Sequence, residues 1–66
     1  MTQQELMTLL EVVRILERTK TDIKITKWFL SINSYLRNER PIDVIGINPE
    51  AVVNAALDEI AGIQHG

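Results

Sequence analysis

The chain is 66 residues long, carries a formal net charge of −2, and contains no cysteine and one histidine, His65. This length allows one small domain, residues 1–66, whose core alone supplies little stability, so we expect association with a partner or a second copy. Disulfides and thiolate metal sites are excluded, and a single histidine leaves too few ligands for zinc. The seven basic residues are scattered along the chain, which argues against direct binding of nucleic acid by this chain alone.

The sequence contains no sign of a membrane span or an export signal. No apolar run approaches the roughly 20 residues that a membrane-spanning helix needs. The first ten residues, MTQQELMTLL, lack the basic start and the small-residue cleavage site of a signal peptide. We therefore expect a cytoplasmic protein without membrane contact.

The first predicted helix runs from residue 3 to about Arg18. Thr2 and Glu5 have the spacing of a capping box, which satisfies free amides of a first helical turn. Helical spacing places five apolar residues on a single face: Leu6, Leu9, Leu10, Val13 and Leu16. Met7 and Val12 widen this face, and Ile15 lies nearly opposite it. So broad an apolar arc has two interpretations. The helix is buried on two sides, or part of its surface is reserved for a dimer or a partner.

A second helix is predicted over residues 22–32, after a polar turn, with Thr21 or Asp22 as its cap. Its inner face would carry Ile25, Trp28, Phe29 and Ile32. The β-branched residues in 23–26 make a short strand a competing prediction. The continuous apolar run over residues 28–30 favours the helix.

The segment that follows is predicted to be irregular and exposed. Asn33 and Ser34 end the second helix, and Ser34 caps a short turn that contains Tyr35 and Leu36. A turn of mixed charge comes next, made of Arg37, Asn38, Glu39 and Arg40. Of these residues, asparagine best tolerates a left-handed backbone.

Two further helical starts are visible in the sequence. Pro41 suits the first position of a helix, which predicts a helical turn over residues 41–45 with Ile42 and Ile45 pointing inward and Gly46 as its stop. Asn48-Pro49-Glu50 combines a cap, a proline and an acid, which predicts a last helix from Pro49 to about Ala61, stopped by Gly62. Its buried residues would be Val52, Val53, Ala56, Leu57 and Ile60. The predicted fold is all-α, a small bundle of three main helices plus a short helical turn.

No catalytic or cofactor site emerges from these residues, so we expect a protein that is not an enzyme. Ser31 and Ser34 have no nucleophile context, and His65 lies at the end of the chain. The carboxylate pairs Asp58–Glu59 and Glu39/Asp43 are interpreted as a solvated helix face and as local capping. A helix-turn-helix over residues 22–32 and 34–45 is disfavoured, because its second helix would contain a proline and two acids facing phosphate.

What the sequence offers instead is an interaction surface. Arginine is common at interface hot spots and forms paired contacts with carboxylates. We therefore expect partner contacts from Arg37, Asn38, Glu39, Arg40 and the terminal His65. The alternative is that the turn is a solvated loop.

These residues also resemble a known family. The order Trp28-Phe29-Leu30, Asn33, Leu36 and Pro41-Ile42-Asp43-Val44-Ile45, followed by an Ala/Val/Leu-rich helix, is similar to the C-terminal toxin-binding domain of Xre/MbcA/ParS-type antitoxins. The similarity extends from about Leu6 to Gly66, and its most specific part is the gapless spacing of Asn33, Leu36, Pro41 and Asp43.

The chain departs from the family pattern in three respects. Ile32 stands where the family has a proline, and Arg37-Asn38 stands where it has a pair of glycines. Full-length members often carry an N-terminal helix-turn-helix domain, which residues 1–66 do not include. We therefore expect a stand-alone member, one domain of a longer protein, or a divergent relative with another partner. These departures bear on the identity of the partner more than on the fold.

The resemblance implies a bacterial or phage antitoxin module with an all-α fold that often self-associates, here as a homodimer. It implies that the chain neutralises a cognate toxin, commonly of the NAD-consuming RES type, by covering its substrate entrance. Such a module performs no chemistry and needs no cofactor. Two other classes of function stay open: a small helical DNA-associated regulator that acts as a dimer, and a structural or adaptor oligomer.

Overall fold

The computed structural model describes the backbone of residues 1–65 and the side chains of residues 1–62, and within them it contains only helices and loops. The elements in chain order are α1 (Gln3–Leu16), α2 (Asp22–Leu30), the 3-10 turn η1 (Ser34–Leu36), α3 (Pro41–Val44) and α4 (Pro49–His65). The predicted all-α fold, with three main helices and a short helical turn, is therefore confirmed. The strand considered for residues 23–26 is not present, because these residues lie within α2.

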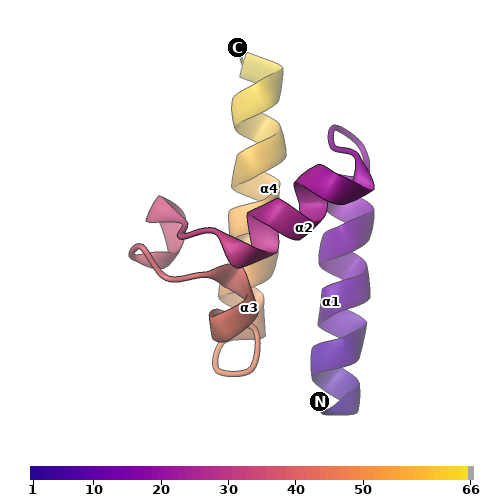
Figure 1. Ribbon diagram of the computed structural model, residues 1–66, viewed down its shortest axis with the longest axis vertical. Coiled ribbons are helices and arrows are strands. Elements are labelled where there is room, and N and C mark those ends of the chain that lie inside the picture. The colour runs from indigo at the N-terminus through magenta and orange to yellow at the C-terminus, as the bar shows by residue number, and fades with distance from the viewer. Residues whose placement is uncertain (66) are drawn as a thin grey trace.

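The two long helices, α1 and α4, pack against each other and run in the same direction (Figure 1). The intervening chain returns across one face of this pair: α2 crosses in front, and α3 and η1 pack against α4. The largest fully buried side chains are Leu16, Val12, Val52 and Pro41. Ala55 and Ala56 of α4 are also buried, and their small side chains leave room for close approach of the neighbouring elements. None of the helices within the described chain has the length and apolar character needed to cross a bilayer.

The helix starts follow the signals in the sequence. The Thr2 hydroxyl accepts a hydrogen bond from the Glu5 amide at 3.1 Å and donates one to the Glu5 carboxylate at 3.1 Å. Pro41 is the first residue of α3. The Asn48 side chain accepts a bond from the amide of Ala51 at 3.3 Å, which caps α4. Thr21 is the cap residue of α2, although its side chain makes no capping bond.

The predicted ends of all three main helices were wrong, and the first helix ends at Leu16 rather than near Arg18. The second helix ends at Leu30 rather than Ile32, because Ser31 turns into an extended conformation and its hydroxyl donates to the Lys27 carbonyl at 2.6 Å. The short turn that follows is capped by Asn33 rather than Ser34. Gly62 does not stop α4, because the described glycines all lack the left-handed backbone that ends a helix and the helix continues to His65.

Several predicted core positions were also wrong. Since α1 packs mainly on α4, it turns Val12 and Leu16 inward and leaves Leu6 and Leu10 exposed, whereas Ile15 packs against the core. Leu57 and Ile42 are exposed because the packing of α4 and α3 turns other residues of these helices inward. Ile32 is 70% exposed because it lies beyond the end of α2. The core roles expected for Trp28, Leu36 and Ile45 are confirmed.

Candidate functional site

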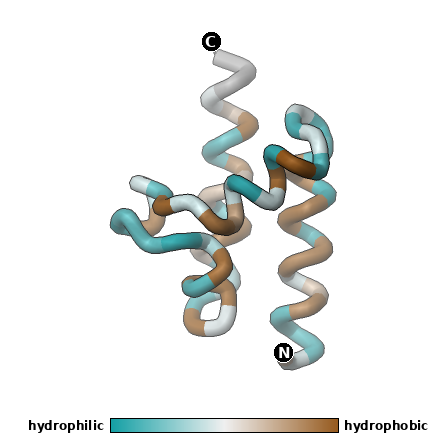
Figure 2. Tube along the Cα trace, in the orientation of Figure 1, coloured by the Kyte–Doolittle hydropathy of each residue, from teal (hydrophilic) through white to brown (hydrophobic). Residues whose placement is uncertain are grey.

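The predicted interaction turn is a closed loop organised by Asn33. The Asn33 amide donates to the Glu39 carbonyl at 3.0 Å, and the Asn33 carbonyl accepts from the amides of Leu36 and Asn38, both at 2.9 Å. The Asn33 side chain accepts from the Tyr35 amide at 2.9 Å. One residue therefore forms hydrogen bonds with both ends and the middle of the loop and closes it. The chain from residue 37 to residue 40 is hydrophilic and exposed, and it projects from the helices (Figure 2).

Two successive residues of this loop have a left-handed backbone, Arg37 with a φ of 58° and Asn38 with a φ of 63°. The conformation of Asn38 was predicted, but that of Arg37 was not. A left-handed conformation costs roughly 1–2 kcal/mol for a residue with a Cβ, and asparagine tolerates it better than arginine does. Leu36 and Pro41 are both buried, so the core fixes the chain on either side of the strained pair.

The two arginines of the turn have different roles. Arg40 donates from Nε to Asp43 Oδ2 at 2.7 Å and from Nη2 to Asp43 Oδ1 at 3.1 Å. These bonds raise the pKa of Arg40 and hold the pKa of the Asp43 carboxyl below its ordinary value. The guanidinium of Arg37 forms no ion pair with the described carboxylates. Of the four predicted residues, Arg37 is therefore the cation left for a partner.

A hollow of about 380 Å³ lies beside Arg37, between the turn and the start of α4. We refer to it as the loop hollow; it is lined by Tyr35, Leu36, Arg37, Glu39, Val44, Ile47, Asn48 and Ala51. Tyr35 is half exposed, and Ile47 is 85% exposed. Sequence reasoning missed both residues. The available signal was the position of Ile47 between Gly46 and Asn48, where an isoleucine has no helical neighbour to pack with.

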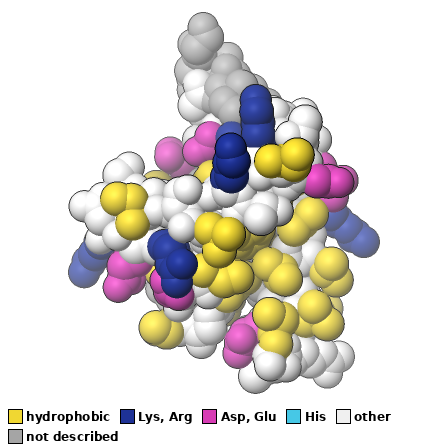
Figure 3. Space-filling view, viewed as in Figure 1, with side chains coloured by type: hydrophobic (Ala, Val, Ile, Leu, Met, Phe, Trp, Pro, Cys, Tyr) yellow, Lys and Arg dark blue, Asp and Glu magenta, His cyan; other side chains and the backbone are white. Residues whose placement is uncertain are grey.

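A second uncovered surface lies on α1. Leu6, Met7 and Leu10, which we call the α1 strip, are all exposed. Figure 3 shows hydrophobic side chains gathered over α1 and toward the middle of the same face. Of the two interpretations of the broad apolar arc, burial on both sides does not apply to these three residues, because the described elements leave them in solvent.

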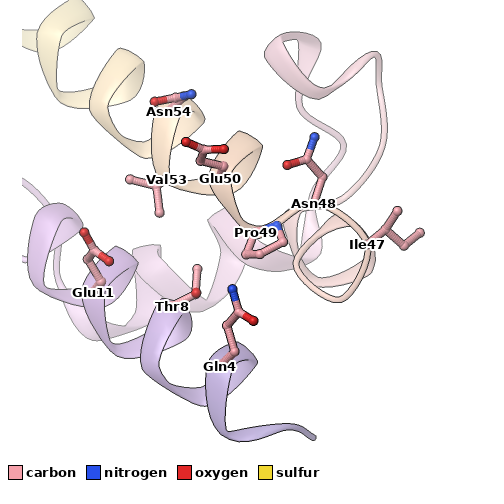
Figure 4. Close-up of a pocket in the computed structure, with 9 residues that line it drawn as sticks. All are labelled: Gln4, Thr8, Glu11, Ile47, Asn48, Pro49, Glu50, Val53 and Asn54. Carbon is pink, nitrogen blue, oxygen red and sulfur yellow. The ribbon is translucent and has the colours of Figure 1, made fainter.

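A polar groove of about 490 Å³ separates α1 from the start of α4 (Figure 4). It is lined by Gln4, Thr8, Glu11, Ile47, Asn48, Pro49, Glu50, Val53 and Asn54. In the close-up the α1 side chains point toward the first turns of α4. The described lining contains amides, a threonine and two carboxylates, but no histidine, cysteine or lysine that could form a nucleophile–base pair with them. Nor do the described residues gather three potential metal ligands at any point.

The other chemistry-bearing residues lie apart from the turn. Glu59, predicted to be solvated, instead forms an ion pair with Lys20 at 3.1 Å, which ties the α1–α2 connection to α4. Asp58 is exposed, as predicted. His65 ends α4, and its side chain lies outside the described residues. Residues 34–45, considered and disfavoured as the second helix of a helix-turn-helix, form a 3-10 turn, a loop and the four-residue α3.

Comparisons with protein-family models, curated proteins and solved structures found no match to this chain. The resemblance to the antitoxin domain therefore stays a prediction from the residues that carry it.

Proposed function

We propose that this chain is a protein-binding module, an antitoxin that neutralises a cognate RES-like toxin by covering its substrate entrance. The antitoxin role rests on the resemblance in sequence, and the observation that supports protein binding is the hydrogen-bonded turn beside the loop hollow. There an arginine with a left-handed backbone and no ion pair among the described residues adjoins two exposed residues, Tyr35 and Ile47. Arginine and tyrosine dominate the energetics of many protein interfaces. The proposed site of action is the bacterial cytoplasm, and inhibition is steric.

A homodimer is part of this proposal. The described elements leave about half or more of each side chain of the α1 strip exposed, and Leu6, Met7 and Leu10 lie on one helical face. In a two-fold dimer the same surface of each copy meets its counterpart, and the α1 strips of two copies are both apolar and can pack against each other. In this arrangement the α1 strip binds the second copy, whereas the turn binds the toxin.

The decisive experiment is co-expression of the chain with a RES-type toxin from the same genome. Growth should stop when the toxin is produced alone and resume when the chain is produced with it. The two proteins should also elute together in size-exclusion chromatography with light scattering. A toxin that stays toxic at equal expression, or that elutes separately, would refute the proposal.

Binding to DNA is the principal competing function. A gel shift at low salt, where phosphate contacts are strongest, tests it directly. A salt-sensitive shift by the chain alone would favour the regulator over the antitoxin.

A further inference from the structure

Arg37 is held in place by the loop rather than by contacts of its own side chain. Glycine would adopt the left-handed conformation of this position without strain, and arginine does not. The hydrogen bonds of Asn33 and the buried side chains of Leu36 and Pro41 hold the backbone there nonetheless. The backbone of the loop is therefore ordered before a partner binds, whereas the exposed Arg37 side chain is ordered only on binding.

The chemistry around Arg37 defines what would fit. The loop hollow draws apolar surface from Leu36, Val44, Ile47 and Ala51, and it has a volume of about 380 Å³. Tyr35, Arg37, Glu39 and Asn48 supply polar groups to the same lining, so it suits a side chain with both apolar and polar neighbours. The hollow therefore combines apolar surface with two charged side chains, Arg37 and Glu39.

The two arginines of the turn differ in how readily a partner carboxylate can bind them. Arg40 is already bound through two donors to Asp43, so a partner carboxylate would have to compete for it. Arg37 has no such carboxylate among the described residues and offers a planar, two-pronged donor. Glu39 lies on the lining and disfavours a second acid in the occupant.

We propose that the loop hollow binds an acidic–aliphatic element of a protein partner, with an aliphatic side chain in the hollow and one adjacent Asp or Glu on Arg37. This inference rests on the proposed function, because it names the surface and the partner chemistry of that same binding activity. It assigns the contact to Arg37, Tyr35 and Ile47, and it leaves Arg40 to stabilise the turn.

The test is selection from a displayed library of random 12-residue peptides on the immobilised wild-type chain. Selected peptides should be enriched in Asp or Glu beside Leu, Ile or Val. The best synthetic peptide is then titrated by fluorescence polarisation. We expect Arg37→Glu and Ile47→Ser each to weaken its binding at least tenfold, and Glu39→Gln to strengthen it. The matched control Arg18→Glu makes the same charge change at an exposed turn far from the hollow and should leave the affinity unchanged.

Folding is separated from binding by Arg37→Gly. This variant suits the left-handed backbone, so it should melt at a higher temperature than the wild type while binding the peptide more weakly. A library that yields no acidic–aliphatic peptide, or peptides whose affinity is the same for Arg37→Glu and Ile47→Ser, would overturn the inference. If the chain neutralises the toxin in such a case, the proposed function stands and only the assigned surface fails. Conversely, peptide binding without toxin neutralisation supports the surface and refutes the antitoxin role.

Discussion

Replacing Arg37 by glycine should stabilise the fold. The left-handed backbone costs an arginine roughly 1–2 kcal/mol, and glycine removes that cost. The added freedom of glycine in the unfolded chain takes back about 0.4–1 kcal/mol. The Arg37 side chain is exposed and makes no ion pair with the described chain, so its removal loses little else. The difference between the two terms is centred on about 0.8 kcal/mol, which corresponds to a rise in Tm of about 3–6 °C for a domain of this size.

The assay is thermal and urea unfolding followed by circular dichroism at one protein concentration. Arg37→Ala is the control for the side chain, because alanine retains the Cβ that causes the strain and should unfold near the wild type. Arg18→Gly is the control for glycine itself, because Arg18 has no positive φ and this variant should be less stable than the wild type. If Arg37→Gly and Arg37→Ala have equal stability, the strain assigned to the backbone is not there.

Three other predictions follow from the core, the turn and the α1 strip. Trp28→Ala should cost about 3–5 kcal/mol of unfolding free energy, and Trp28→Phe much less, because the buried indole Nε1–H has no acceptor in the described chain; equal losses in urea titrations would contradict this account. The pKa of Asp43 is lowered by Arg40, so the unfolded chain takes up the proton first as the pH falls. The wild type should therefore lose stability relative to Asp43→Asn below the ordinary aspartate pKa of 3.8, and parallel pH–stability curves for the two would exclude a stabilising pair. Met7→Glu with Leu10→Glu should leave the helix content unchanged and convert a dimer to a monomer in light scattering; a variant that remains dimeric would move the self-association surface elsewhere.

Local signals predicted where the helices begin. The caps at Thr2 and Asn48 and the prolines at residues 41 and 49 act within a few residues of themselves, so the sequence is enough to place them. The prediction of the core failed where it depended on a neighbour. Leu6 and Ile15 exchange their expected environments because the rotation of α1 is set by its contact with α4, and helical periodicity alone does not contain that contact.

The candidate site shows the same division. The exposure of residues 37–40 and the left-handed Asn38 were predictable from residue type. The left-handed Arg37 was not, because it is imposed by the bonds of Asn33 and by the burial of the residues on both sides of the turn. The loop hollow joins the turn to Ile47 across a gap in sequence, and only the packing of α3 on α4 brings them together.

The parallel pairing of α1 and α4 has a consequence for how the chain is made and removed. The apolar face of α1 packs mainly on α4, which lies at the other end of the sequence. During synthesis that face therefore stays uncovered until α4 has left the ribosome. We expect folding to wait for α4 and then to occur as one event. A protease that unfolds the chain from α4 would also unfold the turn and the loop hollow, and no folded fragment able to bind would remain.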